Sequence, residues 1–152
     1  MAEGIERALT DIDAAVEALA GQPYIDRTKI LIGGQSRGGI LAVAYAAKRP
    51  DLVRGVVNFV GGWMSEECAE RTNINSDTFA RAGARYRKPT LWIYGTDDRF
   101  YGIGHSRGNF AAYTRAGGAG EFAEIAAARP GEGHFIFRQT ADWQPAVAVY
   151  LK

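Results

Sequence analysis

The sequence contains few residues of several kinds, and each scarcity excludes a class of protein. Its 152 residues include one cysteine, Cys68, which cannot close an internal disulfide, so packing must stabilise the fold. The two histidines, His105 and His134, are too few for a metal site, and we expect neither a metal nor another cofactor. No apolar run reaches the roughly 18 residues of a membrane helix, and no signal peptide opens the chain. We expect a soluble protein, cytoplasmic by default, although the sequence does not give the compartment.

The charges of the chain are almost balanced. Eighteen basic and seventeen acidic residues leave a formal net charge of +1, so no field of one sign favours nucleic acid or an acidic membrane as a partner. The hydrophobic fraction is 47%, which is typical of a globular protein and excludes a disordered chain. The length suits one domain, residues 1–152.

Hydrophobic periodicity predicts helices that alternate with strands. The expected helices lie over residues 5–19, 38–49, 76–86, 107–116 and 143–151, and the expected strands over residues 29–33, 53–60, 91–94 and 121–126. Ser76 or Asp77 is expected to cap the third helix, and Asp142 the last. Because strands that alternate with helices pair in parallel, we predict one α/β domain with about four parallel strands flanked by helices.

The segment Gly34-Gln35-Ser36-Arg37-Gly38 fits the pattern G-x-S-x-G and joins an expected strand to an expected helix. A tight turn of this kind would hold the Ser36 hydroxyl above the sheet and aim the backbone N–H of Arg37 at a developing oxyanion. An ordinary glycine-rich turn is the alternative. The sequence excludes a phosphate-binding loop at this turn. A dinucleotide-binding fingerprint needs glycine at the position of Gln35, and a Walker loop needs lysine at the position of Gly39.

A nucleophilic serine needs a base and an acid that orients the base. His134 follows the fourth expected strand in a glycine-rich loop, whereas His105 begins a helix and is expected to be a surface residue. Asp98, after the third strand, is the expected acid, and Asp97 is the alternative. The residue that is not the acid is expected to accept a hydrogen bond in the local turn.

The order Ser36, Asp98, His134 resembles the order of the α/β-hydrolase superfamily. The segments Gly34–Gly39, Tyr94–Asp98 and Gly133–Phe135, with the closing Trp143-Gln144-Pro145, resemble its dienelactone hydrolase-like branch. That resemblance implies a catalytic triad of Ser36, His134 and Asp98. Proper dienelactone hydrolases carry a cysteine at the position of Ser36, so their specific substrate does not follow.

The resemblance also implies that the chain is the C-terminal part of a larger fold, truncated at the N-terminus. The family has about eight strands, and its nucleophile follows the fifth, whereas here it follows the first. The loop that donates the second oxyanion N–H is then missing, and Arg37 is the one donor that can be identified. The strand at Ile30–Ile32 would become an exposed apolar edge that invites pairing with a second copy or with the missing half.

We therefore expect a serine hydrolase that acts on a small molecule through a carboxylic ester or related acyl bond. Gln35, Trp63 and Phe100 are candidate substrate-binding residues, and Tyr101 is expected to line a pocket or pack in the core. One alternative is a catalytically incomplete half-domain that associates through its edge strand. Another is a ligand-binding domain without catalysis.

Overall fold

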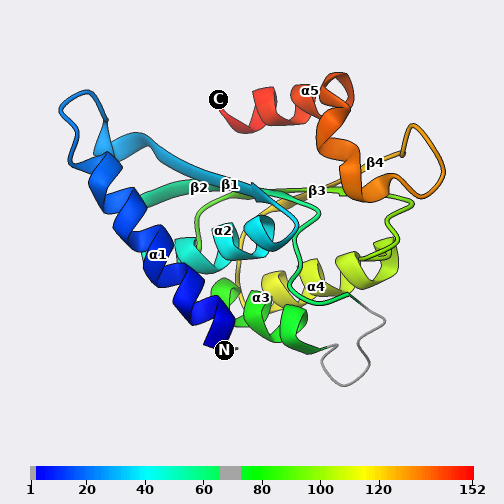
Figure 1. Ribbon diagram of the computed structural model, residues 1–152, viewed down its shortest axis with the longest axis horizontal. Coiled ribbons are helices and arrows are strands. Elements are labelled where there is room, and N and C mark those ends of the chain that lie inside the picture. Colours follow the sequence, from blue (N-terminus) through cyan, green and yellow to red (C-terminus); the bar gives the residue numbers. More distant parts are fainter. Residues whose placement is uncertain (1–2, 66–72) are drawn as a thin grey trace.

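The computed structural model describes residues 3–65 and 73–152, and these residues form a parallel sheet with helices on both faces (Figure 1). The strands are β1 (Ile30–Gln35), β2 (Val53–Phe59), β3 (Thr90–Gly95) and β4 (Glu121–Ile125). The α-helices are α1 (Glu3–Ala20), α2 (Arg37–Lys48), α3 (Asn73–Arg85), α4 (Ile103–Arg115) and α5 (Thr140–Tyr150). Short 3₁₀ helices are η1 (Arg27–Lys29) and η3 (Gly133–Arg138).

The strands pair in parallel in the order β1-β2-β3-β4, which confirms the predicted fold class. Helices α1 to α4 lie on one face of the sheet, and η3 and α5 lie on the other (Figure 1). Strand β3 is buried at every position because β2 and β4 flank it. The largest fully buried side chain, Trp92, packs against Phe79 and Tyr113 between the sheet and the helices.

Three helix beginnings differ from the prediction. Helix α3 begins at Asn73, before both expected caps, and its first turn includes the buried Asn75. Helix α4 begins at Ile103, where the backbone N–H of the buried Ser106 bonds to a carbonyl before the helix. In α3, the bonds of the Asn75 side chain to the backbone of Trp63 and Met64 extend the helix beyond the apolar pattern. Asp142 is not a cap, because it lies inside α5 and its carboxylate accepts a hydrogen bond from the side chain of Gln139.

Strand β1 lies at an edge of the sheet, as the sequence predicts, and pairs with β2 alone among the described residues. Leu31 of this strand is 47% exposed. A groove of about 560 Å³ runs between β1 and α1. Its apolar lining includes Val16, Leu19, Ile25, Ile30 and Ile32. The described part of the chain therefore leaves an apolar edge uncovered.

The described residues can be searched for membrane-spanning helices and for metal sites. No helix within residues 3–65 and 73–152 is long and apolar enough to cross a bilayer. The same ranges hold no group of three histidine, cysteine, aspartate or glutamate side chains placed to bind a metal ion. Cys68, which we expect to form no internal disulfide, lies outside the described residues.

Candidate active site

Ser36 occupies a strained turn between β1 and α2. Its φ of 57° and ψ of −122° lie in a region that residues other than glycine rarely adopt. The surrounding backbone enforces this conformation. The Ser36 N–H donates to the carbonyl of Phe59 at 2.9 Å, and the Ser36 carbonyl accepts from the N–H groups of Gly39 at 2.9 Å and Gly62 at 3.2 Å. Strain that is held in this way is typical of functional turns.

Two glycines allow the turn to close. A Cβ atom on Gly34 would lie 2.3 Å from the carbonyl carbon of Gly38. A Cβ atom on Gly39 would lie 2.3 Å from Oδ1 of the buried Asn58 and 2.8 Å from Cα of Gly61. Positions 34 and 39 therefore require glycine, because backbone and side-chain atoms of neighbouring residues occupy the space, whereas a Cβ atom on Gly38 would meet nothing within 4 Å.

His134 and Asp98 form a buried pair. His134 Nδ1 lies 2.8 Å from Asp98 Oδ2, and the side chain of Asp98 is completely buried. The other carboxylate oxygen, Oδ1, accepts the backbone N–H groups of Phe100 at 2.7 Å and Tyr101 at 3.0 Å. Because an ionised carboxylate only accepts hydrogen bonds, this arrangement assigns the proton to Nδ1 and leaves Nε2 of His134 able to accept one.

The neighbouring Asp97 holds the loop that carries His134. Its carboxylate accepts the backbone N–H of Gly131, and its carbonyl accepts the N–H of Gly133 at 2.8 Å. A Cβ atom on Gly133 would lie 2.4 Å from the carbonyl carbon of Asp97, so the two segments are in close contact. Of the two aspartates, Asp98 is thus the one that contacts the imidazole, and Asp97 serves the local turn.

Tyr101 joins the nucleophile turn to the imidazole. Burial raises the pKa of the Tyr101 phenol, and a hydrogen bond with the Ser36 side chain and the positive charge of Arg37 oppose that rise. The Tyr101 ring lies over Gly62, where a Cβ atom would come within 2.6 Å of it, and its centroid is 5.5 Å from that of His134. Within the described ranges no hydrogen bond links Ser36 directly to His134. Such bonds are often long in enzymes without substrate.

The candidate substrate-binding residues have different environments. Gln35 donates from Nε2 to the backbone carbonyl of His134 at 3.1 Å, so its side chain connects two parts of the site. The ring of Phe100 is half exposed and lies 4.7 Å from that of His134. The ring of Trp63 lies 5.2 Å from Cζ of Arg37. Phe100 and Trp63 therefore border the site.

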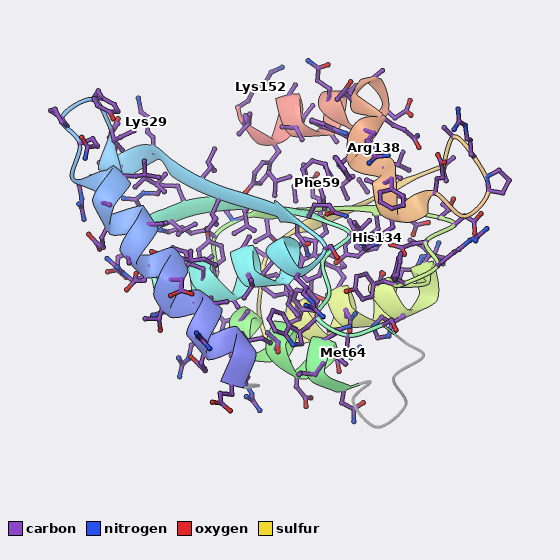
Figure 2. All side chains as sticks on the ribbon, viewed as in Figure 1. Lys29, Phe59, Met64, His134, Arg138 and Lys152 are labelled. Atoms are coloured by element: carbon purple, nitrogen blue, oxygen red, sulfur yellow. The ribbon has the colours of Figure 1, made fainter. Side chains whose placement is uncertain are left out.

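These side chains gather at the end of the sheet where β1, β2 and β3 terminate. Phe59, the last residue of β2, accepts the Ser36 N–H through its carbonyl, and Figure 2 labels both Phe59 and His134. The other predicted histidine, His105, is half buried on α4, and its Nε2 lies 3.2 Å from Nδ2 of Asn75. Sequence reasoning did not assign Tyr101 to the nucleophile. The position of Tyr101, three residues after Asp98, could have indicated that it lies at the site, because its N–H donates to the Asp98 carboxylate.

Comparison with known proteins agrees with the fold. The model of the prolyl oligopeptidase family matches residues 5–78. The structure resembles Est1E from Butyrivibrio proteoclasticus with a TM-score of 0.68 and 14% identity, covering 97% of this chain and 72% of that one. It resembles a thermostable esterase with a TM-score of 0.65 and 15% identity, covering 95% of this chain and 36% of that one. No curated protein matches the sequence.

A peptidase shows the same likeness over a smaller share of its length. The uncomplexed acylaminoacyl peptidase of Pyrococcus horikoshii has a TM-score of 0.65 and 17% identity over 88% of this chain, which spans 26% of the peptidase. The chain thus corresponds to about a quarter of that protein. Together these findings relate it to serine hydrolases of the α/β-hydrolase superfamily. The resemblance to the dienelactone hydrolase-like branch stays a prediction.

Proposed function

We propose that this chain carries the catalytic residues of a serine hydrolase that cleaves a carboxylic ester or related acyl bond of a small molecule. Ser36 is the nucleophile, His134 the base, and Asp98 the group that orients the base. The observation that carries the proposal is the buried contact of 2.8 Å between His134 Nδ1 and Asp98 Oδ2, at the same end of the sheet as the strained turn of Ser36. The relation to serine hydrolases supports it.

In the proposed reaction, the Ser36 hydroxyl attacks the acyl carbonyl while His134 Nε2 takes its proton. Asp98 stabilises the imidazolium that forms. The N–H of Arg37, the first residue of α2, has no partner within the helix and stabilises the oxyanion together with the positive end of the helix dipole. His134 then protonates the leaving group, and water hydrolyses the acyl enzyme by the same steps.

A fluorophosphonate probe tests the proposal directly, because it phosphonylates an activated serine. The full chain is incubated with the probe, digested, and analysed by mass spectrometry. We expect one adduct, on Ser36, that does not form when the protein is first unfolded in denaturant. Folded protein without a label on Ser36 would contradict the proposed function.

Replacing Gln35 with methionine is expected to lower kcat about tenfold and to leave KM nearly unchanged. Methionine keeps the length of the side chain but loses the donor that binds the His134 carbonyl, so the imidazole is held less firmly next to Ser36. Steady-state hydrolysis of a 4-nitrophenyl ester measures both constants. Gln22, whose Nε2 donates to the carbonyl of Ala18 on the exposed end of α1, supplies the matched control Gln22→Met. Equal effects of the two changes would contradict a positioning role for Gln35.

A second candidate function is association through strand β1. The exposed edge, the groove between β1 and α1, and the small share of the acylaminoacyl peptidase that this chain spans favour it. In this reading a strand from a second copy or from an N-terminal half pairs with β1, and the isolated chain has little activity.

Replacing Leu31 with lysine is expected to shift self-association towards the monomer, because the new charge would be buried in any strand pairing at this edge. Size-exclusion chromatography with light scattering, run over a series of protein concentrations, measures the effect. Glu121→Lys places the same residue on β4, at the opposite edge, and is the control. A monomeric wild-type chain at all concentrations would argue against self-pairing.

A further inference from the structure

The side chain of Arg37 stands where helix electrostatics disfavour a cation. Arg37 is the first residue of α2, at the positive end of the helix dipole, and the first turn of this helix has no acidic residue. The side chain is exposed, and no ion pair of Arg37 occurs in the part of the chain that the structure describes. A residue that is locally unfavourable and that no other contact compensates is typical of functional sites.

The guanidinium is nevertheless held in place. Its Cζ lies 5.2 Å from the centroid of the Trp63 ring, a cation–π contact. The backbone that carries this ring is fixed by Asn75, which is buried. Its Oδ1 accepts the N–H groups of Trp63 at 2.7 Å and Met64 at 3.2 Å, and its Nδ2 donates to the Met64 carbonyl at 2.8 Å. A guanidinium stacked on a ring keeps the N–H donors at its edges available.

This cation lies beside the proposed nucleophile. Arg37 directly follows Ser36 in the chain, and its positive charge acts against the rise in the pKa of Tyr101 that burial causes. The negative charge of Asp98 does not neutralise it, because that carboxylate is buried and occupied by His134 and two backbone N–H groups. An acyl group bound at Ser36 would therefore meet a positive charge that Trp63 orients and that has no ion pair among the described residues.

We propose that Arg37 binds a carboxylate carried by the substrate, so that the preferred substrates are acyl compounds with an anionic group a few bonds from the scissile carbonyl. This inference rests on the proposed hydrolase function. The guanidinium edge would hold the carboxylate through two parallel hydrogen bonds, while the N–H of the same residue faces the oxyanion. Monoesters of dicarboxylic acids are the simplest members of this class.

The test compares two esters of equal chain length, mono-4-nitrophenyl adipate and 4-nitrophenyl hexanoate, with the full chain. The quantity measured is the ratio of their kcat/KM values. We expect the wild-type ratio to favour adipate about tenfold, and the preference to weaken as salt is added. Arg37→Gln should remove the preference, and Arg37→Lys should keep part of it. Any effect on the backbone donor changes both esters alike and cancels in the ratio. Arg115→Gln, at the exposed end of α4, is the control and should leave the ratio unchanged.

The outcomes separate the inference from the function on which it rests. Turnover of both esters with a ratio that Arg37→Gln does not change overturns the role of Arg37 and leaves the hydrolase standing. A ratio that Arg115→Gln changes as much as Arg37→Gln also overturns it, because the effect would then come from net charge. No turnover of either ester, with no fluorophosphonate label on Ser36, overturns both proposals.

Discussion

Replacing Ser36 with alanine is expected to lower kcat for ester hydrolysis by at least about 10⁴-fold, because the hydroxyl on which the proposed acyl enzyme forms is removed. The residual rate would come from oxyanion stabilisation and substrate binding alone. Steady-state assays with 4-nitrophenyl hexanoate, together with the loss of the fluorophosphonate adduct, measure the effect. Alanine has the same difficulty as serine with a φ of 57°, so stability should change little.

A serine elsewhere on the chain provides the control for this change. Ser76 is half-buried on α3, and its hydroxyl donates to the carbonyl of Asn73 at 3.0 Å. Ser76→Ala should retain wild-type activity and labelling. Hydrolysis that persists in Ser36→Ala would contradict the assignment of Ser36 as the nucleophile. If neither protein hydrolyses any ester, the ligand-binding domain without catalysis becomes the better interpretation.

Replacing Asp98 with asparagine is expected to lower kcat by about 10⁴-fold with little change in KM. The amide would present its NH₂ group or a weaker acceptor to Nδ1, so the imidazole would no longer be held with its proton on Nδ1 and Nε2 free to act as base. The residue lies under the surface and does not face the solvent, so substrate binding should be spared. The pH–rate profile of the variant would show whether a different base takes over at high pH.

Asp97→Asn is the matched control, since the two carboxylates are neighbours in the same loop. Its side chain accepts from the N–H of Gly131 and does not contact the imidazole, and an amide oxygen can replace that acceptor. We expect a loss of less than about tenfold. Equal losses in Asp97→Asn and Asp98→Asn would indicate that the loop as a whole, and not the orientation of His134, sets the rate.

Most of the fold could be predicted because strong local patterns encode it. The apolar runs at β1, β2 and β3 and the glycines and prolines between the elements define the alternation, and parallel pairing follows from it. The beginning of α3 could not be predicted, because it depends on the buried Asn75, whose partners Trp63 and Met64 lie in another segment. The prediction that Asp142 caps α5 was wrong because the helix begins earlier, and the carbonyl of Gln139, three residues before Asp142, accepts the Asp142 N–H.

The candidate site divides in the same way. The positions of Asp98 and His134 after strands predicted that they lie at one end of the sheet, since the carboxyl ends of parallel strands share one edge, and the two side chains are in contact there. The contacts of individual side chains could not be predicted from the sequence. Gln35 reaches a carbonyl 99 positions along the chain, and Tyr101 meets Ser36 only because Gly62 leaves room for its ring. Such contacts arise from packing, which no local pattern records.

The position of Ser36 at the end of the edge strand has a consequence for how activity is measured. A strand that paired with β1 along its whole length would reach Gln35, which directly precedes Ser36 and the proposed oxyanion site. Association and turnover would then be thermodynamically linked, since a partner that favours the competent turn is itself bound more tightly by it. Specific activity would rise with protein concentration, and the active species would be an assembly in which the partner completes the surroundings of the nucleophile.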